Sequence, residues 1–153
     1  MEPRQRAAVR VLLINDQNAV LLFRGFDPAQ PQAGHYWFTP GGGVDQGESA
    51  AEAAARELRE ETGLALAADQ LGEPVHHDVA HYSFGGVTYR QEQDFFLVRM
   101  PKWQVDTSGF DEVELASVEG YRWWSVAELA VAPEAYYPED LLDVLTRLGV
   151  APC

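Results

Sequence analysis

One segment, Gly42–Leu64, constrains the fold more than any other part of the chain, because it specifies a helix together with both of its ends. Ser49 is followed three residues later by Glu52, which is the spacing of a capping box at a helix N-terminus. Five alanines in the turns that follow favour helix, and Gly63 can adopt the left-handed conformation in which many helices end. The sequence therefore predicts a helix over residues 49–62.

The segments around this helix are typical of strands. Runs rich in branched and aromatic residues, bounded by turn residues, predict two hairpins and a shorter strand, and an amphipathic pattern predicts a second helix near the C-terminus. The strands are expected at 7–15, 19–23, 74–84, 87–100 and 121–124, the helical elements at 126–129 and 140–148, and irregular backbone at 25–34, 40–43 and 102–120. Strands before and after a helix predict an α/β layered structure with a mixed sheet, and the length predicts one domain over residues 1–153.

Three glutamates of the predicted helix, Glu57, Glu60 and Glu61, fall within an arc of about 100° on a helical wheel. The other side of the wheel is small and apolar enough to pack on a sheet, and it holds Ala51, Ala55, Leu58 and Thr62. Like charges at these spacings repel, at a cost of several tenths of a kcal/mol per pair. Mg²⁺ would offset this repulsion, because it prefers oxygen ligands and shares its shell with substrate phosphates. The glutamate face therefore predicts a Mg²⁺ site, with a solvated acidic face as the alternative.

The spacing around these glutamates resembles the Nudix box. From Gly42 it runs five residues to Glu48, seven to Arg56-Glu57-Leu58, one to Glu60-Glu61 and one to Gly63-Leu64. The preceding Phe38, Pro40 and Gly41 and the later Tyr121-Arg-Trp-Trp-Ser element are also similar to features of that family. The resemblance implies a Nudix-type α/β/α sandwich with a mixed β-sheet. It also implies Mg²⁺-dependent hydrolysis, with Mn²⁺ able to substitute, of a nucleoside diphosphate linked to another group.

The resemblance further implies a role for each matched residue. Glu57, Glu60 and Glu61 are the expected metal ligands and belong to the expected catalytic set. Arg56 would orient these carboxylates by ion pairing, and Glu48 would support that network from the preceding loop. A metal-activated water would attack one phosphorus of the diphosphate, and a carboxylate would accept its proton. The candidates for this general base are Glu60, Glu61, Glu92, Asp94, Glu112, Glu114 and Glu119, and the sequence does not choose among them.

Residues outside the box are candidates for substrate binding. Aromatic side chains can stack on a base, and arginines can pair with phosphate oxygens. Tyr82 lies 18 residues past Leu64, an offset that resembles a tyrosine of Nudix enzymes acting on diadenosine polyphosphates. The candidates are Arg24, Trp37, Tyr82, Gly41 and Gly42, with Arg90 and Arg122 as further arginines. For each aromatic residue ordinary packing is the alternative, and for each arginine a solvated strand end.

Three histidines, His76, His77 and His81, offer a different metal site on a predicted strand. The glutamate helix already accounts for a cation, and no cysteine near the histidines completes a zinc ligand set. The histidines are therefore a minor alternative.

Composition limits the partners and the compartment. Twenty-four acidic residues against eleven basic ones give a formal net charge of −13, which repels polyanions and argues against long nucleic acid as a partner. Cys153 is the single cysteine, so an intrachain disulfide is excluded and a reducing compartment is favoured. No apolar run is long enough to cross a membrane. We therefore expect a cytoplasmic protein with a small-molecule nucleotide substrate, no membrane partner, and an oligomeric state that the sequence does not determine.

Three classes of function follow from these observations. The first is a pyrophosphohydrolase acting on a free nucleotide derivative: a modified nucleoside triphosphate, a diadenosine polyphosphate or a nucleotide sugar. The second is a catalytically silent Nudix-fold module that senses a nucleotide, although such modules tend to lose box carboxylates and none is missing here. The third is an RNA 5′-end pyrophosphohydrolase, against which the net charge and the lack of a Lys/Arg cluster in the sequence both count.

Overall fold

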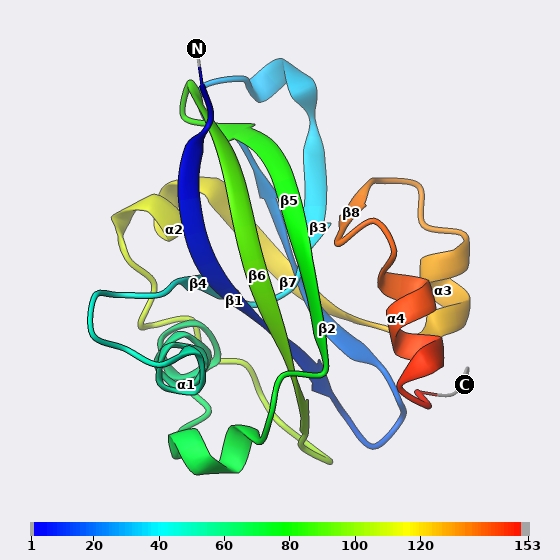
Figure 1. Ribbon diagram of the computed structural model, residues 1–153. Helices are drawn as coiled ribbons and strands as arrows, with labels where there is room; N and C mark the ends of the chain where they lie inside the picture. The colour runs from blue at the N-terminus through cyan, green and yellow to red at the C-terminus, as the bar shows by residue number, and fades with distance from the viewer. Residues whose placement is uncertain (1, 151–153) are drawn as a thin grey trace.

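A curled mixed sheet of eight strands forms the centre of the computed structural model, which describes residues 2–150 (Figure 1). The strands are β1 (Arg4–Ile14), β2 (Val20–Phe26), β3 (His35–Phe38), β4 (Gly41–Gly43), β5 (His76–Phe84), β6 (Val87–Arg99), β7 (Val118–Trp124) and β8 (Tyr136–Tyr137). The helices are α1 (Ala50–Thr62), α2 (Glu112–Ser117), α3 (Val126–Ala130) and α4 (Leu141–Arg147), with short 3₁₀ turns at Pro31–Ala33 and Ala68–Leu71. Cys153 lies outside the described residues.

The sheet is mixed because its longest pairing is parallel. β1 runs beside β6 in an unbroken parallel register from Arg4↔Tyr89 to Ile14↔Arg99. The hairpin partners β1–β2 and β5–β6 are antiparallel, as both predicted hairpins require. The main strand order is β5-β6-β1-β2-β3-β8, while β4 pairs with β1 and β7 pairs with β2. The prediction of a mixed sheet is therefore confirmed.

Helices cover both faces of this sheet. Alternate residues of β1 point to opposite sides, so that Val11 and Leu13 pack in the hydrophobic cluster under α1, whereas Leu12 and Ile14 pack in the cluster under α3 and α4. Figure 1 shows α1 on one side of the strands and α3 and α4 on the other. The three layers agree with the predicted α/β/α sandwich.

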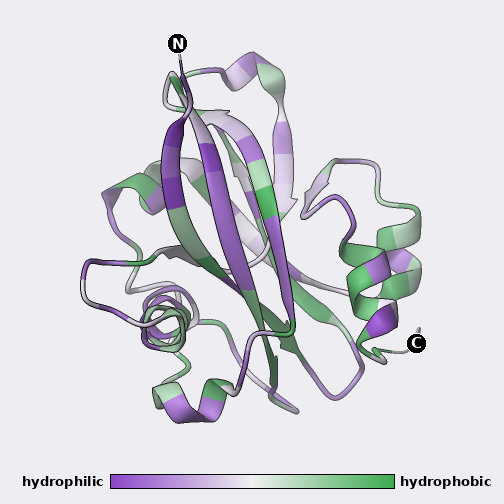
Figure 2. Cartoon of the chain, viewed as in Figure 1, coloured by the Kyte–Doolittle hydropathy of each residue, from purple (hydrophilic) through white to green (hydrophobic). Residues whose placement is uncertain are grey.

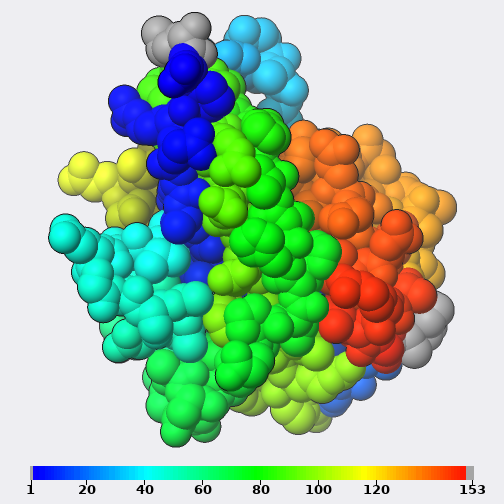
Figure 3. Space-filling model, viewed as in Figure 1, coloured from blue at the N-terminus to red at the C-terminus, as the bar shows by residue number. Residues whose placement is uncertain are grey.

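The helical layers cover one end of the strands better than the other. The C-terminal half of β1, from Val11 to Ile14, is buried, whereas residues 4–7 are exposed. Figure 2 shows the same change in β1 and β6, which are hydrophobic at one end and hydrophilic at the other. In Figure 3 the N-terminal part of β1 lies at the surface of the molecule. One end of the sheet therefore presents polar side chains.

Local signals set the ends of α1 as predicted. The Ser49 side chain accepts a hydrogen bond from the Glu52 N–H, the Glu52 carboxylate accepts one from the Ser49 N–H, and the backbone of Gly63 is left-handed with φ 77°. Among residues 2–150, no helix is long and apolar enough to cross a membrane.

Two backbone expectations were wrong. Residues 41–43 form strand β4, because glycine allows a close approach to β1: a Cβ built on Gly41 would lie 2.0 Å from the Val9 carbonyl oxygen. Residues 102–120 are not one loop, because they contain α2 and the beginning of β7. Asp111, three residues before Glu114, forms a capping box that starts α2, and this local signal was overlooked.

Candidate active site

The buried face of α1 differs from the one read from the helical wheel. Ala53 and Ala54 are fully buried, whereas Ala51 and Ala55 are partly buried at the edge of the hydrophobic cluster. Glu61 is buried with 3% exposure, whereas the Glu60 side chain is 40% exposed, so the three glutamates do not form one outer face. Glu61 contacts Gly41 of β4 and lies beside Glu114 of α2, and a helical wheel contains neither neighbour.

Three carboxylates converge where α1, β4 and α2 meet. Each of Glu57, Glu61 and Glu114 offers an oxygen, and these oxygens lie within 4.8 Å of one another. Glu61 accepts a hydrogen bond of 2.8 Å from the Gly41 N–H of β4. Glu60 is not a member of this group, and its side chain is 40% exposed. Glu114 is the one residue of the group that comes from outside the box.

The chain leaves the charge of this group incompletely balanced. Burial raises the pKa of Glu61 well above its ordinary value, and the neighbouring carboxylates of Glu114 and Glu57 raise it further. Burial also raises the pKa of Glu57, against the opposing effect of Arg56. Carboxylates that are gathered and buried in this way fit a divalent cation with a preference for oxygen ligands, such as Mg²⁺.

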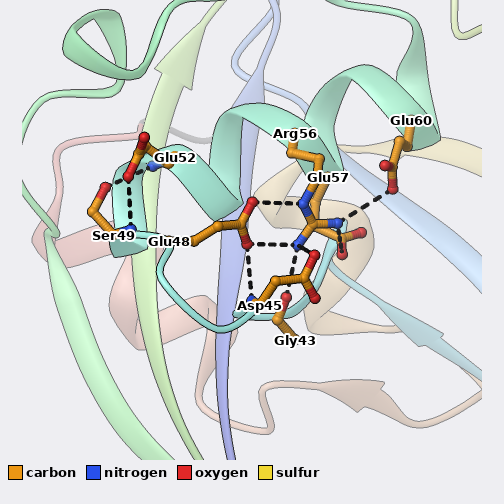
Figure 4. A network of polar contacts seen from close by, with 8 residues as sticks. All are labelled: Gly43, Asp45, Glu48, Ser49, Glu52, Arg56, Glu57 and Glu60. Carbon is orange, nitrogen blue, oxygen red and sulfur yellow. Dashed lines mark hydrogen bonds and ion pairs between the residues drawn. The ribbon is translucent and has the colours of Figure 1, made fainter.

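Arg56 lies between the loop before α1 and Glu57, at the edge of the carboxylate group (Figure 4). Its guanidinium forms a two-pronged ion pair with Glu48, at 2.8 and 3.0 Å, and a third contact of 2.9 Å with Glu57. It also donates to the Gly43 carbonyl oxygen at 2.9 Å and lies 3.4 Å from Glu60. The guanidinium lowers the pKa of Glu48 to about 2. Arg56 therefore fixes Glu57 from one side and ties the loop before α1 to β4.

The glycines of β4 make room for charged side chains on its two faces. A Cβ on Gly42 would lie 2.5 Å from Oε1 of Glu57. A Cβ on Gly43 would lie 3.1 Å from Nη2 of Arg6, which comes from β1. The predicted contacts Gly41 and Gly42 thus lie beside the carboxylate group.

Of the other predicted substrate contacts, Arg24 and Trp37 are engaged elsewhere. Arg24 pairs with both oxygens of Glu134, at 2.9 and 2.7 Å, and with Glu119 at 3.1 Å. Trp37 donates to Glu134 at 3.0 Å and packs edge-on against Trp124. No recorded contact within residues 2–150 joins either side chain to the carboxylate group. Both side chains belong to the ion-pair network around Glu134.

Tyr82 belongs to a polar network that sequence reasoning missed. Its hydroxyl accepts a hydrogen bond from Arg6 at 3.0 Å and donates one to the buried Gln91 at 2.7 Å. Gln91 donates to Gln93 at 2.8 Å, and Arg10 lies 3.4 Å from the same Gln93 oxygen. Arg6 also lies against Gly43 of β4, so this network reaches the face of β4 opposite to the one that Glu57 contacts.

Three arginines of β1 share one face of the sheet. Side chains alternate along a strand, and the register of β1 with β6 is unbroken, so Arg4, Arg6 and Arg10 point the same way. Burial lowers the pKa of Arg10, while the charge of Glu61 opposes this effect. The sequence predicts no Lys/Arg cluster, because these arginines become neighbours on one face only when the segment forms a strand.

The remaining candidates for a general base lie apart from the group. Asp94 pairs with His77 at 2.8 Å, and Glu92 lies 3.8 Å from the same imidazole. Glu119 pairs with Arg24. Among the acids predicted outside the box, Glu114 is the one that the structure brings to Glu57 and Glu61 within the described residues.

The three histidines of β5 do not converge on one site. Whereas His77 contacts β6, His76 faces Asp78 and Asp140 at 3.7 and 3.8 Å. Arg147 lies 2.8 Å from the other ring nitrogen of His76, so this cluster already contains a cation. The arginines Arg90 and Arg122 are likewise occupied, by Gln5 with Glu92 and by Glu128, respectively.

Sequence comparisons identify relatives of this chain. A family model described as NUDIX domain matches residues 4–145. An RNA pyrophosphohydrolase of Erythrobacter litoralis is 37% identical over 111 residues, which cover 67% of this chain and 66% of that protein. An RNA pyrophosphohydrolase of Afipia carboxidovorans is 33% identical over 129 residues, 76% and 71% of the two chains. A Bacillus subtilis protein, provisionally named an 8-oxo-dGTP diphosphatase, is 39% identical over 82 residues, 51% of each chain.

Structure comparison supports the fold. The crystal structure of a MutT protein from Methanosarcina mazei Go1 superposes with a TM-score of 0.68 and 21% identity, covering 96% of this chain and 94% of that one. At this identity the likeness concerns the arrangement of the strands and helices. It confirms the predicted fold class.

Proposed function

The chain belongs to the Nudix family, and we propose that it is a Mg²⁺-dependent pyrophosphohydrolase that cleaves a diphosphate linkage at the 5′ end of RNA. The observation that carries the proposal is the convergence of Glu57, Glu61 and Glu114 at the junction of α1, β4 and α2. The proposal differs from the free-nucleotide substrate expected from composition, because the curated relatives and the arginine face of β1 both favour an RNA end.

Each residue of the group is assigned a separate role in the proposed reaction. Glu57, fixed by Arg56, and Glu61, fixed by the Gly41 N–H, would hold the cation. Glu60 lies outside the group, 3.4 Å from Arg56, and is proposed as a further ligand of the cation. When bound, the cation supplies charge stabilisation at the phosphoryl oxygens and lowers the pKa of water. Glu114 is less buried than Glu61 and lies in the same group, so we assign to it the acceptance of the proton from the attacking water.

The arginines of β1 support a substrate with several phosphates. Arg6 lies against Gly43, on the face of β4 opposite to Glu57, and Arg4 lies on the same face of β1 as Arg6. Guanidinium groups bind phosphate oxygens through paired hydrogen bonds. The net charge of −13 disfavours a long basic track for RNA, but recognition of a 5′ end requires only a local group of cations.

A free modified nucleoside triphosphate is the second candidate substrate. The Bacillus subtilis relative favours it, and so does the acidic surface, which would repel the body of an RNA. The chemistry at the carboxylate group is the same for both candidates. They differ in whether nucleotides beyond the first one contribute to binding.

A length series separates the two candidates. We would measure kcat/KM with Mg²⁺ for a nucleoside triphosphate and for 5′-triphosphorylated oligoribonucleotides of two to eight nucleotides, identifying the 5′ product of each. The proposal expects a 5′-monophosphate product and a kcat/KM that rises with the first added nucleotides. A higher kcat/KM for free, particularly oxidised, nucleoside triphosphates would favour the second candidate. Binding without hydrolysis of any substrate would contradict both and favour a sensor.

A further inference from the structure

We propose that Gly109 is a positioning residue that holds Glu114 beside Glu61, by allowing the chain before α2 to lie directly on the last turn of α1. This inference rests on the proposed function, in which Glu114 takes part in the reaction. It concerns how the group of carboxylates is assembled, because Glu114 reaches Glu61 from a separate six-residue helix.

The segment that leads to α2 is attached to the C-terminal end of α1. The Thr62 carbonyl oxygen accepts hydrogen bonds from the Trp103 indole at 2.8 Å and from the Asp106 N–H at 3.0 Å. A Cβ on Gly63 would lie 2.9 Å from the Cβ of Asp106, so the two backbones are in close contact there. The path of the segment is therefore fixed before it reaches Gly109.

Gly109 makes the closest approach of this segment to the helix. A Cβ at this position would lie 2.5 Å from the Glu60 carbonyl oxygen and 3.1 Å from the Glu60 Cα. These are backbone atoms of a helix, so they cannot move aside as a flexible side chain can. Gly109 is not among the residues with left-handed φ, so what requires glycine here is the contact and not the backbone conformation.

The four residues after Gly109 transmit its position to Glu114. The Phe110 ring packs edge-on against Phe23, with 5.5 Å between the ring centroids. The Asp111 N–H donates to Oε1 of Glu114 at 3.0 Å, and the Glu114 N–H donates to the Asp111 side chain at 2.8 Å. This capping box orients the Glu114 side chain as well as starting the helix.

Glu114 needs such support because it joins the group from a short separate helix. Its carboxylate lies with those of Glu61 and Glu57. A helix as short as α2 has little stability of its own. The contact at Gly109, the anchor at Phe110 and the capping box therefore hold Glu114 in the group.

Gly109→Ala is the direct test. Restoring an ordinary contact distance of 3.4 Å from 2.5 Å requires a shift of about 1 Å, which α2 would share. Misplacement of a catalytic group by this amount can cost about 10²-fold, so we expect kcat to fall between about tenfold and a hundredfold while KM changes less than about twofold. Gly120→Ala is the matched control, because a Cβ there meets nothing within 4 Å and the backbone is not left-handed. It should leave both constants unchanged.

A double-mutant cycle with Glu114→Gln distinguishes positioning from general damage. If Gly109 acts through Glu114, adding Gly109→Ala to Glu114→Gln should change kcat by less than about twofold. Multiplication of the two effects would overturn the proposal, as would full activity of Gly109→Ala. If Gly109→Ala does not fold, as judged by circular dichroism, Phe110→Leu enters the same cycle in its place.

The outcomes also separate this inference from the proposed function. A wild-type protein without metal-dependent turnover would contradict the proposed function itself. Turnover by the wild-type protein with an equally active Glu114→Gln variant would contradict the role of Glu114, and with it the inference about Gly109. A large effect of Glu114→Gln with no effect of Gly109→Ala would overturn the inference and leave the proposed function intact.

Discussion

The two sides of α1 carry the same kind of residue in opposite electrostatic situations. On the side of the preceding loop, Arg56 supplies a cation to Glu48 and Glu57, and the pKa of Glu48 falls to about 2. On the side of the sheet, Glu61 meets Glu114, and burial raises its pKa well above the ordinary value. Arg56 thus neutralises Glu48 in the loop before α1, whereas Glu61 and Glu114 would be neutralised by a bound metal ion.

The largest expected effect comes from the two box glutamates of the carboxylate group, of which Glu57 is paired with Arg56. Glu57→Gln and Glu61→Gln should each lower kcat/KM by more than about 10³-fold, because several kcal/mol of charge stabilisation by the metal are lost. Both substitutions preserve side-chain shape, so the fold should remain intact by circular dichroism. Glu112→Gln, an exposed acid of α2, is the control and should retain activity. Substantial turnover by both box variants would show that the group is not the catalytic centre.

Arg56→Lys tests the ion pairs that Arg56 forms with Glu48 and Glu57. Lysine keeps the positive charge but loses the planar fork that contacts Glu48, Glu57 and the Gly43 carbonyl oxygen. Residues that orient metal ligands typically contribute about 10- to 100-fold, and we expect a loss of kcat/KM within this range. In a titration with Mg²⁺, half-maximal activity of Arg56→Lys should require a higher Mg²⁺ concentration than that of the wild type. An unchanged Mg²⁺ dependence would mean that Arg56 supports the loop alone.

The comparison also predicts how stability responds to pH. Because the pKa of Glu61 is raised in the folded protein, its contribution to stability is full below the ordinary glutamate pKa of about 4.3 and is lost as pH rises through the raised value. Glu48 behaves oppositely: its contribution is present above its ordinary pKa and is lost as pH falls towards about 2. Metal-free protein should therefore lose the contribution of Glu61 as the pH rises above the ordinary glutamate pKa of about 4.3, where Glu48 stays ionised.

Urea unfolding with and without Mg²⁺ measures this response. Glu61→Gln removes the Glu61 contribution and should make the metal-free protein less sensitive to pH than the wild type, with the raised pKa of His77 acting equally in both. Mg²⁺ should stabilise the wild type more at pH 8 than at pH 5, because protons compete with the metal for the carboxylates. Equal stabilisation of Glu61→Gln by Mg²⁺ would contradict the assignment of Glu61 as a ligand.

The sequence predicts the ends of α1 and its pairing with the preceding loop better than it predicts the carboxylate group, because the interactions at the ends and in the loop are local. Ser49, Glu52 and Gly63 fix the helix ends within a few residues of the chain, and the structure has the same ends. Glu114 was one of several acids in a presumed loop, and its place beside Glu61 depends on the path of the chain around the end of α1. The burial of Glu61 depends in turn on its neighbours in β4 and α2, Gly41 and Glu114, which no local pattern contains.

The role of the arginines of β1 also depends on contacts that the local sequence does not contain. Arg4 and Arg6 precede the strand predicted at 7–15, and only the longer strand of the structure brings them to one face with Arg10. Arg24 was predicted to pair with phosphate oxygens, with a solvated strand end as the alternative, yet Glu134 and Glu119, far along the chain, pair with it. Whether an arginine is available to a substrate is thus decided by acids that are distant in sequence.

The smallest expected effect follows from that neutralisation. Arg24→Gln should leave kcat/KM within about threefold of the wild type, since its guanidinium is already paired, and it should lower stability only slightly, as for other exposed ion pairs. Arg6→Gln is the matched variant on the face next to Gly43. It should raise KM for a 5′-triphosphorylated oligonucleotide severalfold, because a phosphate contact is lost. If Arg24→Gln had the larger effect on KM, the phosphates would contact β2 and not the arginines of β1, and those arginines would be only a solvated strand end.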